Sequence, residues 1–532
     1  MRALDRKLVR ELMRLKGQIV TIALVIASGI TSFIALRGAY ASLEAARTAY
    51  YDRFRFAHVF VHVERAPEAV ARRIERIPGV ELVDTRISEE VTLPIEGMGR
   101  TPYGRLLSLP RSGQPVTNAL SLRSGRLPEP GRDDEVVLLE PFARAHGLEP
   151  GHHVPVVIDG KLYQLRVVGL ALSPEFVYAI RPGAIADDPK RYAVLWMERG
   201  ALAVAFRLEG AFNDLTLRLQ PGASSPAVRA ALDRILAPYG SVGAIDRKDQ
   251  ISNRILSGEL GQLATLSGMI PLIFLGVAAF LLNLVLGRLI RLQRHELATL
   301  KAVGYTNAEV ARHYLALVAV IMVPGALLGL LGGWALGTFL MTVYQAVFRF
   351  PELAFVMSPT LVVTALLVSS AASVSGALFA IRAAVKLPPA EAMRPPAPAH
   401  YKQSLLDRLG LATFLGPSAM MVWRELRRRP LRTALSSLGI AGAVALVIFG
   451  RFGMDSISRY FEATFKREQR QDLSVTFESP VEPRTVGALA RWPGVTTAEG
   501  LRASAPTVRG STGLSKVTDR SWRCSRLKVA SK

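Results

Sequence analysis

The stretch that decides the fold is residues 260–287, LGQLATLSGMIPLIFLGVAAFLLNLVLG, which contains no Asp, Glu, Lys or Arg over 28 residues. An apolar helix of about 20 residues is long enough to cross a bilayer, so this stretch predicts a membrane span. Four other stretches share the property: 17–36, 314–348, 353–381 and 433–450. The 532-residue chain is therefore predicted to be an α-helical polytopic membrane protein.

The basic residues are distributed unevenly along the chain. The net charge is +23, and residues 1–16, 288–313 and 382–432 carry +4, +3 and +7 of it, whereas residues 37–259 carry only +2. Short basic segments beside apolar spans are typical of cytoplasmic loops. We therefore expect a cytoplasmic N-terminus and an extracytoplasmic segment 37–259. No basic stripe with interleaved aromatic residues is present, so we expect no nucleic-acid partner.

The first span could instead be a signal peptide, because basic residues precede it and Ala39-Tyr40-Ala41 resembles a cleavage site. Its 20-residue length and its recurrence favour a permanent span. Residues 8–12, LVREL, return as 422–426, VWREL, and a span follows each of them. The offset is 414 residues, which predicts a duplicated architecture whose second copy begins with the fifth span. Residues 516–524 show no strand or helix period, and we interpret residues 511–532 as the aberrant tail of a truncated product.

The segment between the first two spans has the patterns of a folded α/β domain. A strand, helix, strand order is predicted over 58–63, 67–77 and 80–87, and it returns over 214–219, 226–236 and 241–245. Three β segments lie between them, at 135–139, 154–158 and 162–170. We predict a large extracytoplasmic α/β domain of two βαβ units with a small β-rich lobe inserted between them.

The predicted boundaries are as follows: 1–16 cytoplasmic N-terminus, 17–36 first span, 37–259 extracytoplasmic domain, 260–287 second span, 288–313 cytoplasmic coupling loop, 314–348 third span, 349–352 short outer loop, 353–381 fourth span, 382–432 cytoplasmic linker, 433–450 fifth span, 451–510 partial second extracytoplasmic domain and 511–532 aberrant tail.

The spans contain no ionisable residue in their interiors, which disfavours an ion-coupled transporter. The third span instead has glycines at spacings of four. Small residues in this register let a second helix approach closely, so we predict tight packing against a neighbouring helix or a second subunit. These glycines are Gly325, Gly329, Gly333 and Gly337.

The loop after the second span has helical apolar spacing at Leu297, Leu300 and Val303. Gly304 stands where a helix C-cap favours glycine, and Thr306 to Glu309 fits a capping box that begins the next helix. The pattern predicts a short amphipathic helix on the cytoplasmic face. Periodicity alone also permits a helix that lies among the lipid headgroups.

Three sets of residues together resemble one family. His295 to Tyr305, HELATLKAVGY, and Lys386 to Arg394, KLPPAEAMR, resemble segments that follow the second and last spans in FtsX-like, MacB-type ABC transporter permeases. The outer segments GRLP at 125–128, EVVL at 135–138 and GLEPG at 147–151 resemble their periplasmic core domain. The resemblance runs through most of residues 1–500 in order.

The resemblance implies a permease subunit that transmits the ATP-driven motion of a separate ATPase to the outer domain. The cargo would be a lipoprotein, lipid or peptide, the location a bacterial inner membrane, and the partners the ATPase, membrane lipid and an outer-face protein. ATP and Mg would be bound by the partner and no cofactor by this chain. The coupling helix would dock onto the ATPase through Glu296, Leu297, Leu300, Lys301, Ala302, Gly304 and Tyr305.

Other functional classes have less support. No phosphate-loop motif occurs, and the eight histidines are scattered. His58 and His62 share a strand face and could pair on a metal, but a surface role is the commoner one for such residues. No grouping of Ser, His and acid offers a nucleophile, so we expect no catalytic and no metal site. The alternative is a non-transporting, ATP-linked signal transducer or scaffold, for example one that regulates cell-wall hydrolases.

Overall fold

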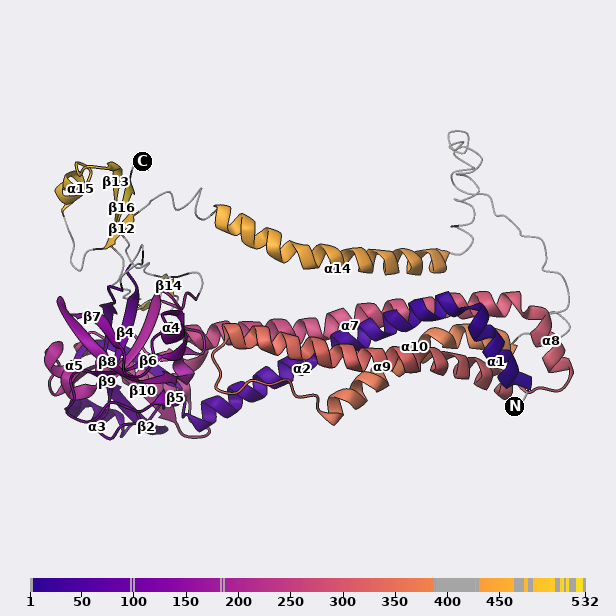
Figure 1. The fold of residues 1–532 in the computed structure, drawn as a ribbon, viewed down its shortest axis with the longest axis horizontal. Coiled ribbons are helices and arrows are strands. Elements are labelled where there is room, and N and C mark those ends of the chain that lie inside the picture. Colours follow the sequence, from indigo (N-terminus) through magenta and orange to yellow (C-terminus); the bar gives the residue numbers. More distant parts are fainter. Residues whose placement is uncertain are drawn as a thin grey trace. The chain divides into compact units, whose positions relative to one another are not determined.

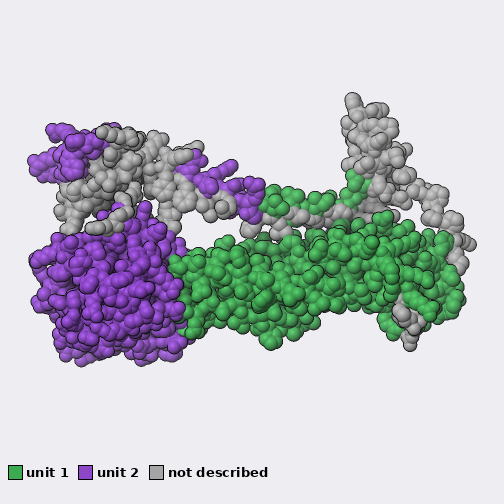
Figure 2. Space-filling view, viewed as in Figure 1, with its two compact units in different colours: residues 1–49, 256–448 green, residues 50–255, 449–532 purple. Residues whose placement is uncertain are grey.

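The computed structural model describes residues 3–95, 98, 101–181, 184, 187–386, 388, 426, 430–463, 473–476, 482–502, 508–510, 513–515 and 523–529. The chain divides into two compact units (Figure 2): residues 1–49 with 256–448, and residues 50–255 with 449–532. Most of the predicted linker 382–432, and of the motif at 386–394, lies outside the described residues.

The first unit is helical (Figure 1). Among the described residues, four of its helices are long and apolar enough to cross a membrane. They are α2 (Lys16–Arg53), α7 (Ile251–Leu292), α9 (Asn307–Val347) and α10 (Pro359–Lys386). The first two contain the first and second predicted spans, and the other two overlap the third and fourth. The predicted start of the fourth span at residue 353 is wrong: its helix begins at Pro359, so the segment after the third helix is longer than the predicted outer loop 349–352. Two shorter helices accompany them, α1 (Ala3–Arg14) and α8 (Arg294–Ala302). The predicted class, a polytopic helical membrane protein with a large domain between its first and second spans, is confirmed.

A stripe of isoleucines on α2 forms the centre of the helical core. Ile22, Ile26, Ile30 and Ile34 repeat every four residues and are almost completely buried. They pack in one cluster with residues of α7, α9 and α10, among them Leu282. Large apolar side chains on the other faces of α9 and α10 are exposed, as lipid-facing residues are.

The second unit contains a four-stranded sheet in the order β11-β1-β10-β2. Its strands are β1 (Val59–Pro67), β2 (Val80–Arg86), β10 (Ala211–Leu219) and β11 (Ile245–Asp246). Every neighbouring pair is antiparallel, so β10 lies between the parallel strands of the first βαβ unit and β1 between those of the second. The two predicted βαβ units therefore interleave into one sheet, a split βαβ arrangement. The helix α3 (Ala71–Ile74), preceded by η1 (Glu68–Val70), belongs to the first unit, and α6 (Ser225–Leu236) belongs to the second.

The inserted lobe is larger than predicted. It is a seven-stranded mixed sheet in the order β5-β8-β6-β9-β4-β3-β7, and additional β8–β7 pairing joins six of the strands into a closed ring. One apolar cluster contains residues such as Val136 and Leu195, and a second contains Val137 and Trp196 from the same strands. The elements are β3 (Ser88–Thr92), β4 (Tyr103–Leu109), β5 (Ser121–Gly125), β6 (Glu135–Leu139), α4 (Glu140–Ala145), β7 (His153–Ile158), β8 (Lys161–Leu172), η2 (Pro174–Phe176), β9 (Tyr192–Glu198) and α5 (Arg199–Ala205).

The predicted repeat is visible in the order of elements. α14 (Pro430–Glu462) begins 414 residues after α2 and contains the fifth predicted span, and β12 (Leu473–Thr476), α15 (Pro483–Leu489) and β13 (Val495–Arg502) follow. Strands occur at 513–515 and 523–529 within the predicted tail, and the second begins inside the stretch 516–524 for which the sequence predicts no strand. The latter strand, β16 (Arg523–Val529), pairs antiparallel with both β12 and β13, as β10 pairs with β1 and β2.

Candidate functional site

The predicted coupling helix is α8, and the turn after it is the one that the sequence indicates. Gly304 has φ +104°, a left-handed conformation that favours glycine, and the Tyr305 amide donates to the Leu300 carbonyl at 3.1 Å. The next helix, α9, begins with a complete capping box between Thr306 and Glu309. The loop therefore holds two helices in a defined turn.

The predicted docking residues do not all lie on one face of α8. Leu297 is 2% exposed and belongs to the core of the helical unit, whereas Leu300 and Tyr305 are half-buried. Glu296, Ala302 and Gly304 are exposed, and Val303, which the docking set omitted, is 75% exposed. The exposed residues therefore form the surface that a partner could contact, whereas Leu297 packs α8 against the core of the helical unit.

Two lysines connect α8 to other helices of its unit. The Nζ of Lys7, on α1, lies 2.6 Å from the Glu296 carboxylate and 3.2 Å from the side-chain oxygen of Gln293. The Nζ of Lys301 donates to the carbonyls of Ala384 and Val385, at 3.2 and 2.7 Å. These carbonyls are at the C-terminal end of α10, where backbone acceptors lack helical partners. Burial lowers the pKa of Lys301. Helix α8 is thus attached to both α1 and α10.

The four glycines of α9 lie at close helix contacts within the chain. A Cβ at Gly329 would be 2.6 Å from the Ile30 Cβ, and one at Gly333 would be 2.7 Å from the Ile34 Cβ. Gly325 faces Ile26 in the same way, while Gly337 lies against the ring of Phe355. Glycine at these positions lets α2 and α9 approach closely.

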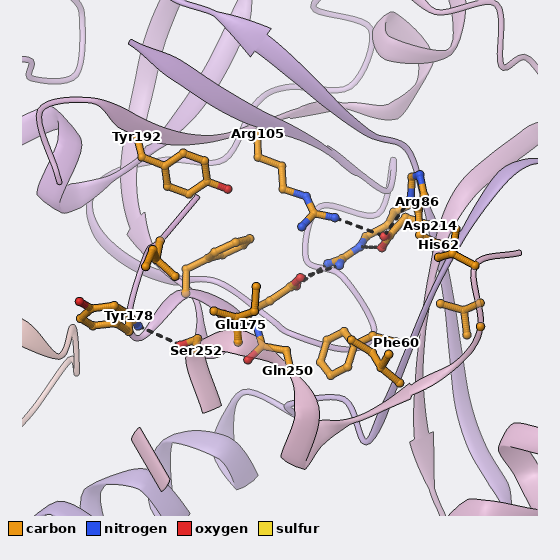
Figure 3. A pocket seen from close by; sticks show the side chains of 17 residues that line it. Phe60, His62, Arg86, Arg105, Glu175, Tyr178, Tyr192, Asp214, Gln250 and Ser252 are labelled. Atoms are coloured by element: carbon orange, nitrogen blue, oxygen red, sulfur yellow. Dashed lines mark hydrogen bonds and ion pairs between the residues drawn. The ribbon is translucent and has the colours of Figure 1, made fainter. Parts of the chain in front are cut away.

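The second unit contains a pocket of about 190 Å³ that the sequence did not reveal (Figure 3). Its wall includes β1, β2 and β10 of the four-stranded sheet, β4 and β9 of the inserted lobe, and the first residues of α7. Residues at this end of α7 bond to the segment from η2: Gln250 donates to the Glu175 carbonyl at 2.9 Å, and the Ser252 hydroxyl accepts from the Tyr178 amide at 2.9 Å. The pocket therefore lies where three parts of this unit meet.

A buried ion triad forms one side of the pocket. The Arg86 guanidinium donates to both oxygens of Glu175, at 2.6 and 2.8 Å, and its Nε donates to Asp214 at 2.5 Å. Burial favours the neutral carboxyl of Asp214, but Arg86, with His62 and Arg105, holds its pKa well below the ordinary value. Burial likewise opposes the charge of Arg86, and Asp214 and Glu175 raise its pKa. Arg86 and Asp214 therefore stay charged.

The two histidines of the predicted strand face do not converge on a metal. The Nδ1 of His58 accepts a hydrogen bond from the Leu219 amide at 3.0 Å, and the Nδ1 of His62 lies 3.7 Å from Asp214. No group of three or more His, Cys, Asp and Glu side chains that could hold a metal ion occurs in the described part of the chain.

In the described part of the chain, one long apolar helix precedes the folded domain in the sequence and three follow it. Residues 268–389, which run from α7 to just beyond α10, match the family described as FtsX-like permease C-terminal. This match confirms the predicted resemblance to FtsX-like permeases. No curated protein matches the chain.

Among the solved structures similar to part of the chain are three separate domains. The periplasmic region of MacB from Actinobacillus actinomycetemcomitans is 12% identical, over 37% of this chain and 92% of that one, with a TM-score of 0.24. The extracellular domain of the noncanonic ABC-type transporter YknZ from Gram-positive bacteria is 11% identical, over 36% and 100%, with a TM-score of 0.25. A domain of a putative permease protein from Porphyromonas gingivalis is 18% identical, over 35% and 84%, with a TM-score of 0.20.

Proposed function

We propose that this chain is the permease subunit of an ABC transporter and that it transmits the ATP-driven motion of a separate ATPase to its outer domain. ATP and Mg would be bound and hydrolysed by that partner. The proposed transport activity is the export or extraction of a lipoprotein, lipid or peptide. The family match to residues 268–389 supports the class, and the attachments of α8 support the transmission of motion.

The observation that carries the proposal is the way α8 is held. Its exposed surface includes Val303, while Lys7 and Lys301 connect it to α1 and α10. Leu297 inserts from α8 into the core that α2, α7, α9 and α10 share. If a docked ATPase displaced α8, the helices packed against it would therefore move as well. Motion passes between packed helices in this way.

The path toward the outer domain is provided by α2 and α7. Both continue beyond their charge-free stretches, α2 to Arg53 and α7 back to Ile251. Side chains join the two helices in these extensions: Arg47 bonds to Ser257 at 3.4 Å, and Tyr51 bonds to Asn253 at 3.1 Å. We propose that this helix pair carries the motion.

The location proposed for the chain is a bacterial inner membrane, with the N-terminus and α8 in the cytoplasm and residues 37–259 outside. Membrane-impermeant thiol labelling tests this topology in a Cys524→Ser background. Cysteine at Glu209 should react from the outer side and cysteine at His295 only from the inner side. Labelling of both positions from the same side would contradict the proposed function, which requires α8 and residues 37–259 to lie on opposite sides of the membrane.

The docking role is tested by substitution on the exposed surface of α8. Val303→Asp should abolish ATP hydrolysis that co-purifies with the full chain from its host membrane, while leaving membrane insertion intact. Val204→Asp, an equally drastic change at a residue that is 66% exposed on α5 of the other unit, is the matched control and should have no effect. Gly304 is unsuitable because its positive φ would strain any other residue. Retention of full ATP hydrolysis by Val303→Asp would remove the docking role.

Reconstitution separates transport from signalling. The purified complex in proteoliposomes should release a membrane-anchored lipoprotein or labelled lipid when ATP is hydrolysed. ATP hydrolysis without release would favour the non-transporting transducer instead.

A further inference from the structure

The pocket of the second unit has hydrogen-bond donors without partners. Tyr192, at the start of β9, is 7% exposed, yet no hydrogen bond of its hydroxyl is found among the described residues. Its ring lines the pocket, and Figure 3 shows the hydroxyl directed toward Arg105 and the pocket interior. The hydroxyl oxygen is not among the fully buried side-chain atoms that lack a partner in the described residues, so it is open to the pocket and can donate there to a ligand.

The guanidinium of Arg105 supplies a second free donor. Its Nε donates to the Ser88 hydroxyl at 2.8 Å, and one terminal nitrogen reaches Asp214 at 3.4 Å. The other terminal nitrogen has no bonded partner in the described part of the chain. Arginine carries five donors and no acceptor, so Arg105 faces the pocket with N–H groups still to be satisfied.

The acceptors of the pocket, in contrast, are already engaged. Both oxygens of Glu175 accept from Arg86, and one of them also accepts from the Asn118 amide at 3.0 Å. Asp214 accepts from Arg86 and Arg105. A ligand that completes the hydrogen bonding must therefore bring acceptors rather than donors.

The remaining wall of the pocket has an apolar part beside the polar side chains of His62, Tyr178, Gln250 and Ser252. The apolar part includes aromatic rings from Phe60 and Phe176 and aliphatic side chains from Val242 and Ile245, the last two of which are exposed at the surface. The volume of about 190 Å³ is below the 300 Å³ or so of a pocket for a drug-sized molecule. It suits a group of the size of one large apolar side chain.

We propose that this pocket binds a compact carboxylate with an apolar body, the carboxylate accepting hydrogen bonds from Tyr192 and Arg105 and the body lying against the aromatic wall. Charge-assisted hydrogen bonds of this kind are the stronger ones. Burial raises the pKa of Tyr192 to about 12, so its hydroxyl keeps the proton that it donates. The proposal concerns residues of the second unit and does not depend on the proposed ATPase.

The same chemistry could come from a free small carboxylic acid or from the C-terminal residue of a peptide. The probes are therefore 3-phenylpropanoate and a tetrapeptide that ends in phenylalanine. Each has an uncharged counterpart of the same shape, 3-phenylpropanamide and the amidated peptide. Binding to the full chain in nanodiscs is measured by saturation-transfer NMR on the ligand.

We expect 3-phenylpropanoate to bind and its amide to bind at least about tenfold more weakly, as the loss of a hydrogen bond to a charged group implies. Tyr192→Phe removes only the hydroxyl and should weaken binding of the acid by about five- to tenfold. Tyr163→Phe on β8, which does not line this pocket, is the matched control and should bind as the unchanged chain does.

The peptide decides the source of the ligand. Binding of the free-acid peptide together with 3-phenylpropanoate would assign the pocket to a peptide C-terminus, and binding of 3-phenylpropanoate alone would assign it to a small acid. Absence of binding by both acids at 10 mM, roughly the weakest affinity accessible to the method, would overturn the proposal. Equal affinity for acid and amide, or an unchanged affinity in Tyr192→Phe, would overturn it as well.

Discussion

Replacing Arg86 by methionine should destabilise the second unit because two buried carboxylates would lose their shared cation. The side chains of Glu175 and Asp214 are 5% and 7% exposed, so solvent can replace little of what Arg86 provides. Breaking a buried pair by removing one partner typically costs about 3–5 kcal/mol. Asn118 and Arg105 still contact the carboxylates, which favours the lower value, about 3 kcal/mol.

Hydrogen exchange of the full chain in nanodiscs measures this loss locally. Amides of β2 and β10 that exchange by opening of the unit should do so roughly 100-fold faster in Arg86→Met, since each 1.4 kcal/mol is about tenfold. Arg191→Met is the matched control: the side chains of Arg191 and Asp188 are 54% and 48% exposed and lie 3.4 Å apart, and loss of such an exposed pair costs at most about 1 kcal/mol. Acceleration below about threefold, or equal to that of the control, would refute the account.

The free energy of unfolding of the second unit should also depend differently on pH in Arg86→Met. With Arg86 present, the low pKa of Asp214 contributes stability above the ordinary carboxyl pKa near 3.8, and this is lost as pH falls. Without Arg86, burial should raise that pKa, so stability is lost instead as pH rises above about 4. The difference between the two proteins should therefore grow from pH 4 to pH 7. A difference that is constant over this range would contradict the role of charge.

Three further changes test other contacts. Gly329→Leu should place a side chain against Ile30 and lower the free energy of unfolding of the helical unit by about 1–3 kcal/mol. Gly276→Leu is the control and should leave it unchanged, because a Cβ at Gly276 meets open space. Equal effects of the two changes would contradict close packing of α2 and α9. Burial lowers the pKa of His58 to about 4. Between pH 6.5 and 4 only the unfolded chain readily takes up a proton at this residue. The second unit should therefore lose about 1–2 kcal/mol of its free energy of unfolding as pH falls through this range. His58→Asn should flatten this pH dependence, as measured by hydrogen exchange. Lys301→Met should accelerate amide exchange in α8 and at the end of α10, and unchanged exchange would show that its two hydrogen bonds contribute nothing to holding them together.

The helical unit could be predicted well because its signal is local. A span is recognised from an absence of charge along one segment, and this feature does not depend on what the segment packs against. The turn after α8 was also predictable, since Gly304 and the capping box of Thr306 and Glu309 act within a few residues. Which face of α8 is buried could not be predicted, because the position of Leu297 depends on helices that are distant in sequence.

The inserted lobe shows where periodicity fails. All seven residues of β9, Tyr192–Glu198, are buried, so the strand lacks the alternation by which a half-exposed strand is recognised. β6 is buried in the same way, although its short run of apolar residues was predicted as a strand at 135–139. Both strands have apolar clusters on their two faces, and a continuous apolar run in a sequence does not indicate which strands will pair. The closed ring therefore depends on pairings that only the structure shows.

The pocket was missed for a similar reason. Arg86 and Asp214 are 128 residues apart, and Arg86 and Glu175 are 89 apart, so no spacing connects them. A weak signal existed: a charged residue within a strand whose neighbours are buried must find a partner. This signal indicates that Asp214 is paired, but it does not say with which residue or beside what cavity.

The position of the pocket suggests how a ligand could matter to the proposed function. Gln250 and Ser252, at the start of α7, bond to Glu175 and Tyr178 in the pocket wall. A ligand changes an equilibrium between two conformations only by the difference in its affinity for them. If α7 moves relative to η2 during the ATPase cycle, the pocket changes shape and its ligand shifts the cycle by that difference. The affinity of 3-phenylpropanoate should then differ between nucleotide-free and ATP-bound complexes, and equal affinities would limit the pocket to binding alone.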